Sequence, residues 1–172
     1  METVWTIGHS TRAIEEFLGL LQAQEIALLA DVRTIPKSRT NPQFNSEALA
    51  ASLNAAGIEY RHLAGLGGLR HARKDSENSG WKNASFRGYA DYMQTQAFAA
   101  ALDELEALAR ARRTAIMCAE AVPWRCHRSL IADALNVRGW RALEIIGAGV
   151  PREHKRTSFS RVAAGRLTYP AA

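Results

Sequence analysis

Short apolar runs alternate with stretches of helical periodicity along most of the chain. Five of these segments indicate strands, and the one at residues 26–32 is continuously apolar, as expected of a strand buried on both faces. They cover residues 3–8, 26–32, 58–63, 114–118 and 140–146. Between them, apolar residues recur every three or four positions, as on the buried face of a helix. The expected helices begin near residues 14, 46, 89 and 127, and the third is expected to run unbroken from Tyr89 to Arg112.

This alternation of strands and helices predicts an α/β fold. In such folds helices join successive parallel strands and cover the sheet. We therefore expect a single domain with a mostly parallel sheet of about five strands and helices on both faces. A chain of 172 residues is long enough for one such domain with a sizeable core.

Charge divides the chain into two parts. The net charge is +5, but residues 1–150 are nearly balanced, whereas residues 151–172 hold five cations against one glutamate. We expect residues 1–150 to form the α/β domain and residues 151–172 to form a basic C-terminal tail. Such a tail either attracts polyanions such as nucleic acid or is simply solvated.

No segment indicates a membrane or secreted protein. All apolar runs are shorter than the ~18 residues that a membrane span needs. The first residues lack the basic and apolar regions of a secretory signal. Two cysteines are too few for a scaffold held by disulfides. We therefore expect a cytoplasmic protein without a membrane partner, and the sequence leaves its oligomeric state open.

Polar residues follow each of the first four predicted strands. The loops after the carboxyl ends of parallel strands gather at one edge of the sheet, where ligands bind. We therefore expect these residues to meet there. They are His9 and Ser10 after the first strand, Asp31 and Arg33 after the second, Arg70 in the loop beyond the third, Cys118 and Glu120 after the fourth, and Arg125, Cys126, His127 and Arg128 at the start of the next helix.

The two cysteines are the best candidates for chemistry. Cys126 lies near a predicted helix N-terminus among cationic neighbours, and both features favour a thiolate. A thiolate attacks electrophiles or carries a transferred sulfur atom. Either cysteine can be the nucleophile or the resolving thiol, and Cys118 taken alone can also be a small buried side chain. The catalytic candidates are Cys118, Cys126, His127 and His9 as bases, and Glu120 as a group that orients the base or carries a proton.

Arginines near the cysteines predict an anionic substrate. Arg33, Arg125 and Arg128 are expected to hold its negative charge. The expected substrate-binding residues are Ser10, Asp31, Arg33, Arg70, Arg125 and Arg128. The leading hypothesis is therefore a cysteine-dependent enzyme of sulfur or acyl-type transfer, acting on an anionic small molecule.

Two other interpretations remain open. A nucleic-acid or nucleotide binder, including one that processes bases, would use the basic loop 70–87 and the tail, with Trp81 and Phe86 for stacking. A zinc protein would use the two cysteines and His127, with His9 or Glu120 as fourth ligand. The seven residues between the cysteines are not a compact zinc spacing, so no metal or cofactor is expected. A disulfide between them is expected in a reducing compartment only if it is catalytic.

Several motifs resemble those of one bacterial and archaeal family, domain of unknown function family 488. The resemblance spans about residues 4–146. Its motifs are Thr-Ile-Gly-His-Ser at 6–10, Asp-Val-Arg at 31–33, Leu-Gly-Gly at 66–68, the segment 86–93, and Cys-Ala-Glu at 118–120 through Cys-His-Arg at 126–128. It implies a compact α/β domain whose cysteines do enzymatic work, but it implies no particular reaction.

A weaker similarity is to rhodanese-like domains. They also place Asp-x-Arg after one strand and a reactive cysteine after a later one, which implies Cys118 as the sulfur acceptor. The loop from Cys118 to Arg125 is longer here and includes Glu120 and Pro123. Because a carboxylate opposes the binding of anions, we do not expect phosphatase activity.

Overall fold

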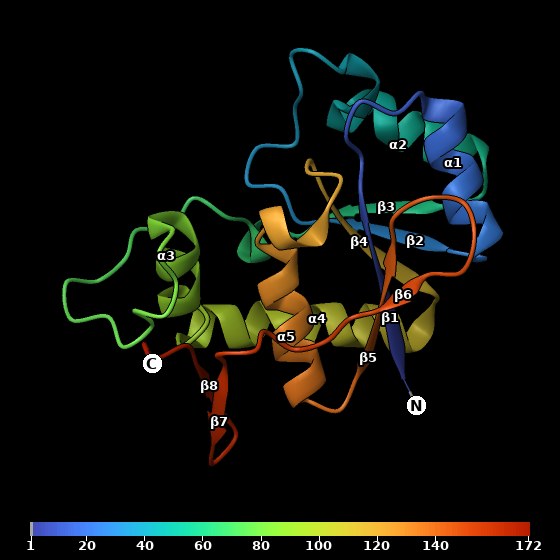
Figure 1. The fold of residues 1–172 in the computed structure, drawn as a ribbon. Coiled ribbons are helices and arrows are strands. Elements are labelled where there is room, and N and C mark those ends of the chain that lie inside the picture. Colours follow the sequence, from blue (N-terminus) through green and yellow to red (C-terminus); the bar gives the residue numbers. More distant parts are fainter. Residues whose placement is uncertain (1) are drawn as a thin grey trace.

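The computed structural model describes residues 2–172 and confirms the predicted α/β fold (Figure 1). The strands are β1 (Thr3–Gly8), β2 (Leu28–Asp31), β3 (Glu59–His62), β4 (Thr114–Cys118), β5 (Arg141–Ile145), β6 (Arg152–Glu153), β7 (Arg161–Ala163) and β8 (Arg166–Thr168). The α-helices are α1 (Ile14–Ala23), α2 (Ser46–Ala55), α3 (Ala84–Tyr92), α4 (Gln96–Ala111) and α5 (Arg128–Val137). Short 3-10 turns at Pro42–Phe44, Ala64–Leu66 and Pro123–Arg125 complete the elements.

Six strands form one sheet in the order β3-β2-β4-β1-β5-β6. The first five along the chain are parallel, and all five were predicted to within two residues. The short β6 pairs antiparallel with β5, and β7 and β8 form a separate hairpin. Because β1 lies between β4 and β5, the ends of β1 and β4 lie side by side, with Gly8 opposite Cys118.

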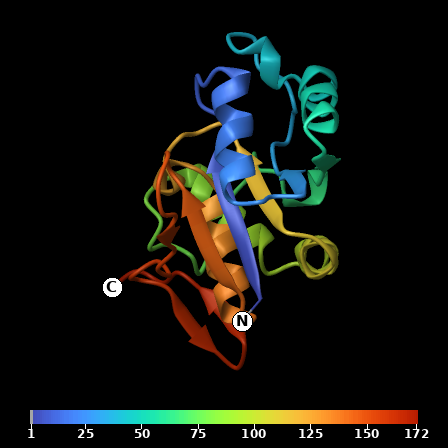
Figure 2. The same ribbon diagram turned by 90° about the vertical axis from the view of Figure 1, so that its right-hand side faces the viewer.

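Helices cover the sheet on both faces, as predicted. Figures 1 and 2 show α1 and α2 on one side of the sheet and α3, α4 and α5 on the other. Successive side chains of a strand point to opposite faces. In β4, Met117 therefore packs with α1 and α2, while Ile116 and Cys118 belong to the core beneath α4 and α5. This alternation aims the Cys118 side chain toward the start of α5.

The expected unbroken helix from Tyr89 to Arg112 is wrong, because the structure contains two helices there. The first, α3, begins earlier, where the side chain of Asn83 accepts hydrogen bonds from the first turn. It ends at Tyr92, and the Thr95 hydroxyl then accepts a hydrogen bond from the Phe98 N–H and begins α4. A threonine cap inside a run of helical periodicity restarts the helix in a new direction.

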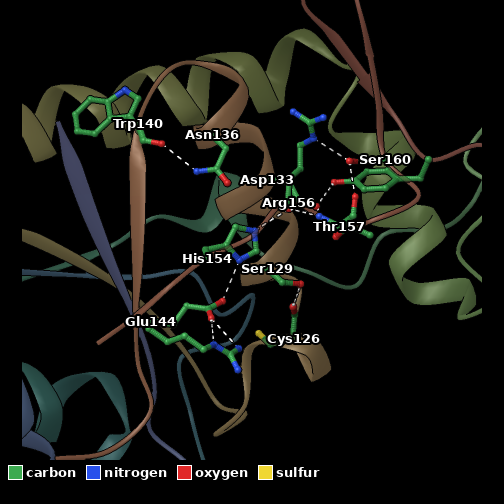
Figure 3. Close-up of polar contacts among 12 residues, drawn as sticks. Cys126, Ser129, Asp133, Asn136, Trp140, Glu144, His154, Arg156, Thr157 and Ser160 are labelled. Atoms are coloured by element: carbon green, nitrogen blue, oxygen red, sulfur yellow. Dashed lines mark hydrogen bonds and ion pairs between the residues drawn. The ribbon is translucent and has the colours of Figure 1, made fainter. Parts of the chain in front are cut away.

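The residues after β5 pack against the domain. In addition to β6, the C-terminal segment (residues 151–172) places Tyr169 in the core, where 1% of it is exposed. Figure 3 shows the polar contacts that fasten this segment. His154 lies between two buried carboxylates: its Nε2 is 2.7 Å from Asp133 Oδ1 and its Nδ1 is 2.9 Å from Glu144 Oε2. The hydroxyls of Thr157 and Tyr169 donate to the second oxygen of Asp133.

Within residues 2–172, no helix has both the length and the apolar character needed to cross a bilayer.

The His154 contacts predict a dependence of stability on pH. Burial alone would lower the pKa of His154, but the hydrogen bonds and charges of Asp133 and Glu144 outweigh it and raise the pKa from 6.5 to about 9. The folded protein holds this proton more tightly than the unfolded chain does. The contribution of protonated His154 to the free energy of unfolding is therefore complete below pH 6.5 and is lost as the pH rises through 9. We expect a loss on the order of 3 kcal/mol in the free energy of unfolding, measured by urea denaturation.

The variant His154→Gln tests the origin of this effect. It should be less stable than the parent at pH 6 and should lack most of the decline toward high pH. An equal decline in both proteins would show that another group is responsible.

Candidate functional site

The ends of β1, β2 and β4 bring the predicted site residues to one edge of the sheet. The His9 N–H donates to the Cys118 carbonyl at 2.9 Å, and the Ser10 N–H donates to the Ala119 carbonyl at 2.8 Å. The segment after Cys118 then folds across Gly8. A Cβ atom at Gly8 would lie 1.6 Å from the Glu120 carbonyl oxygen, so only glycine allows this close approach.

A cavity of about 340 Å³ opens at this edge, and we call it the cysteine cavity. Of the residues predicted for the site, it is lined by Arg33, Cys118, Glu120, Arg125, Cys126 and His127. The other lining residues come mainly from the loops after β2 and β3 and from α3: Thr34, Ile35, Lys37, Gly68, Leu69, Ser85, Phe86, Tyr89 and Ala119.

The two cysteines meet at the floor of the cavity. Cys118 ends β4 and Cys126 lies two residues before α5, and the structure joins them as a disulfide. Both are buried, with 2% and 6% of their surfaces exposed. Among residues 2–172, no three His, Cys, Asp or Glu side chains converge as metal ligands. The zinc interpretation therefore lacks a ligand set in the described chain.

His127 turns one ring nitrogen toward the Cys126 sulfur. Its Nε2 lies 2.9 Å from the Val32 carbonyl, which can only accept, so Nε2 carries the hydrogen. The lone pair of Nδ1 then faces the Cys126 sulfur at 3.6 Å. Burial lowers the pKa of His127, which keeps the ring neutral at pH 7. The ring of Tyr89 packs against that of His127 with centroids 4.9 Å apart. Gly68 lies close to the same ring, because a Cβ atom at Gly68 would be 3.3 Å from Nδ1.

Arg128 is buried beneath Cys118 rather than exposed to a substrate. Only 1% of it is accessible, and its Nη1 donates to the Cys118 sulfur at 3.3 Å and to the Glu120 carbonyl at 2.9 Å. Nη2 donates to the Ala121 carbonyl at 3.1 Å, while Nε has no partner among the described residues. Burial lowers the pKa of Arg128 to about 10, so it remains a cation at pH 7. No carboxylate of residues 2–172 forms an ion pair with it.

Asp31 and Arg33 form a buried ion pair behind the cavity. Arg33 Nε and Nη2 donate to the two oxygens of Asp31 at 2.9 and 2.7 Å. Nη2 also donates to the Phe44 carbonyl at 2.8 Å. Asp31 has no exposed surface and accepts a further hydrogen bond from the Tyr60 hydroxyl. Asp31 therefore positions Arg33, which retains little donor capacity for a substrate.

His9 belongs to the same buried network. Its Nδ1 lies 2.8 Å from the Ser10 carbonyl and therefore carries the hydrogen, so Nε2 is left to accept from Arg33 Nη1 at 3.5 Å. The ring stacks on Phe44 with centroids 4.4 Å apart. Burial lowers the pKa of His9 as well. Its lone pair thus faces Arg33, whereas that of His127 faces the Cys126 sulfur.

The exposed cations at the cysteine cavity are only partly those that were predicted. Arg125 and Lys37 are exposed on the rim of the cysteine cavity, and the described chain gives neither of them a carboxylate partner. Arg70 stacks on Tyr92 at 3.7 Å and does not line this cavity. Lys37 is absent from the predicted site. Its position in the loop after the second predicted strand was the available signal, because such loops gather at the edge of the sheet where ligands bind.

In the basic loop 70–87, the aromatic side chains proposed for base stacking already pack against other residues of the protein. The Trp81 ring lies 5.1 Å from Phe86, 4.8 Å from Phe159 and 5.4 Å from Tyr169. It joins the loop to the C-terminal segment. The nucleic-acid interpretation therefore retains the basic residues of the loop, while Trp81 serves packing.

Comparison with known proteins identifies a family. A family model described as "Domain of unknown function DUF488" matches residues 13–135, a range that includes both cysteines, His127 and Arg128. No curated protein and no solved structure gives a match.

The close approach at Gly8 predicts a strong effect of a single methyl group. Gly8→Ala should displace the segment after Cys118 and lower the free energy of unfolding by about 2 kcal/mol or more, measured by urea denaturation. Gly19→Ala is the matched control, because a Cβ at Gly19 in α1 meets nothing within 4 Å. It should leave stability unchanged or raise it slightly. Equal stabilities of the two variants would contradict the proposed role of Gly8.

Proposed function

This chain belongs to the DUF488 family, and we propose that it is a cysteine-dependent enzyme that transfers sulfur from an anionic donor. The family description names no reaction. The proposal therefore rests on the contacts of the two cysteines and on the charges around them.

The contact between Arg128 and Cys118 carries the proposal. A buried guanidinium without a carboxylate in ion-pair contact is costly, because it has lost its hydration, and the charges of Glu144 and Glu120 act on Arg128 only over a longer distance. The nearest group that can become negative is the Cys118 sulfur, 3.3 Å from Nη1. When the disulfide is reduced, a thiolate at Cys118 supplies the missing charge. The reduced protein thus holds a nucleophile at the floor of the cavity.

The second thiol favours sulfur transfer over acyl transfer. Acyl transfer needs one thiol, and it would leave the paired Cys126 without a chemical role. In sulfur transfer, Cys126 can resolve a persulfide on Cys118, because the two sulfurs are in contact. His127 Nδ1, facing Cys126 at 3.6 Å, accepts the proton of that thiol.

The reaction balances in two steps. The Cys118 thiolate attacks the outer sulfur of a persulfide or thiosulfonate donor; the donor's sulfur–sulfur bond breaks, its remainder leaves as an anion, and the outer sulfur stays on Cys118. Cys126 then gives its proton to His127 and attacks the Cys118 Sγ atom. His127 passes the proton to the departing sulfur, which leaves as hydrosulfide as the disulfide forms. The two cysteines are oxidised and the transferred sulfur is reduced. An external thiol reductant restores both thiols.

The rim of the cavity suits an anionic donor. Arg125 and Lys37 present positive charge that no described carboxylate neutralises. Both the donor and the anion that leaves after the first step carry negative charge, so these cations assist binding and departure. Glu120 on the same rim disfavours highly charged anions.

The first prediction from this proposal concerns the reactivity of Cys118. In the Cys126→Ser variant, the rate of alkylation by iodoacetamide should reach its plateau well below pH ~8.5, where an ordinary cysteine thiol is half ionised. Adding Arg128→Met should move the plateau back toward that pH, because the thiolate loses its cationic neighbour. Arg128→Lys keeps the positive charge and should keep the plateau at low pH. That result would show that the shift in Arg128→Met comes from the lost charge and not from a loss of folding.

The control is Arg125→Met, which removes an exposed cation from the same cavity. It should move the plateau far less than Arg128→Met. If both substitutions act equally, or if Cys118 titrates as an ordinary thiol in the parent, the assignment of the thiolate is wrong.

The second prediction concerns sulfur transfer itself. Thiosulfate offered to Cys126→Ser should leave one added sulfur atom on Cys118, detected by intact mass. The reduced parent should release sulfide instead, and Cys118→Ser should do neither. A lack of loading by both thiosulfate and glutathione persulfide would overturn the proposal, and ester hydrolysis that depends on Cys118 would favour the acyl alternative.

A further inference from the structure

We propose that a second hollow beside the cysteine cavity binds the base and sugar of a ribonucleotide. The inference goes beyond the proposed function and does not rest on it, because no step of the sulfur transfer involves a nucleotide. The hollow has a volume of about 640 Å³, within the range of small-molecule sites.

Hydroxyl and amide side chains gather in this hollow, which we call the hydroxyl cavity. They are Ser10 and Thr11 after β1 and Ser38, Thr40 and Asn41 after β2. Of these five side chains, only that of Ser38 has a hydrogen-bond partner within residues 2–172, because its hydroxyl accepts from the Asn41 N–H at 3.0 Å. Neutral donors and acceptors from two loops match the hydroxyl groups of a sugar, which both donate and accept hydrogen bonds.

Trp124 supplies an aromatic surface on the wall of the hydroxyl cavity. Although apolar, it is 57% exposed. The guanidinium of Arg152 lies over its ring at 5.2 Å and is itself held by Glu144 at 2.8 and 2.9 Å. Trp124 lines both the hydroxyl cavity and a neighbouring hollow, and Arg152 lines only the neighbouring one. A planar base stacks well on such a supported ring.

The two cavities share a wall that carries a cation. Ala119, Glu120 and Arg125 line both of them. A molecule in the hydroxyl cavity that extends toward Cys118 therefore passes Arg125. Because Arg125 has no carboxylate partner in the described chain, it is available for a phosphate group, and Glu120 on the same wall favours a phosphate of low charge. An aromatic surface, hydroxyl side chains and a cation around one hollow offer contacts for the base, ribose and phosphate of a nucleotide.

Binding measurements on full-length Cys118→Ser separate this inference from the sulfur chemistry. The probes are the four ribonucleoside monophosphates, adenosine, ribose 5-phosphate and inorganic phosphate, measured by isothermal titration calorimetry. At least one nucleotide should bind about tenfold more tightly than ribose 5-phosphate, as expected for one stacked base. A failure of sulfur loading leaves this result unaffected, because the variant lacks the nucleophile.

Substitutions then assign each part of the ligand. Trp124→Ala should remove the preference for the nucleotide over ribose 5-phosphate. Arg125→Met should weaken the nucleotide and ribose 5-phosphate but not adenosine. Arg161→Met, on the exposed hairpin, is the charge control and should change none of these affinities.

Three results would overturn the inference. One is that no nucleotide binds. Another is that ribose 5-phosphate or inorganic phosphate binds as tightly as every nucleotide, which would indicate an anion site without a base pocket. The third is that Trp124→Ala leaves the preference intact.

Discussion

A buried guanidinium is the constraint around which this site is organised. Arg128 lies under the end of β4 with three of its hydrogen bonds directed to a sulfur and two carbonyl oxygens, and no carboxylate pairs with it. Carbonyl dipoles reduce the cost of burying a cation but do not neutralise it. In the function that we propose, the Cys118 thiolate of the reduced protein completes the charge balance. The proposal links stability to reactivity, because one contact would both satisfy the arginine and keep the cysteine ionised.

The fold provides this arrangement through close packing of the strand ends. Gly8 has no side chain, so the segment after Cys118 crosses it and turns the carbonyls of Glu120 and Ala121 toward Arg128. The start of α5 brings Cys126 and His127 to the same point. The loop after β2 fixes the tautomer of His127 through the Val32 carbonyl. Because the strands are parallel, their carboxyl ends lie at one edge of the sheet, and this edge brings together Cys118, Cys126, His127 and Arg128.

Much of this could be predicted from the sequence, because strand periodicity and the strand-end rule depend on local patterns. They predicted the five parallel strands and the grouping of Cys118, Cys126 and His127. The roles of the arginines could not be predicted, because they depend on which way a side chain points. Arg128 and Arg33 turn inward to buried partners, while Arg125 stays on the rim.

The same limit applies to the C-terminal segment. Its charge leaves open a solvated tail or one that attracts polyanions, and neither interpretation includes the contacts of His154 and Tyr169 with Asp133, which join residues far apart in the chain. Local patterns carry no signal for such a pairing. The segment also supplies Arg152, which supports Trp124, so the part of the chain that contributes least to the sheet shapes the wall of the hydroxyl cavity.

Counting thiolates in the reduced protein tests the central claim most directly. The ultraviolet absorbance of the thiolate group, measured during a pH titration, should show one thiolate already present at neutral pH in the parent and in Cys126→Ser, and none in Cys118→Ser. Absorbance that rises only near pH ~8.5 in all three proteins would show that Arg128 does not hold a thiolate.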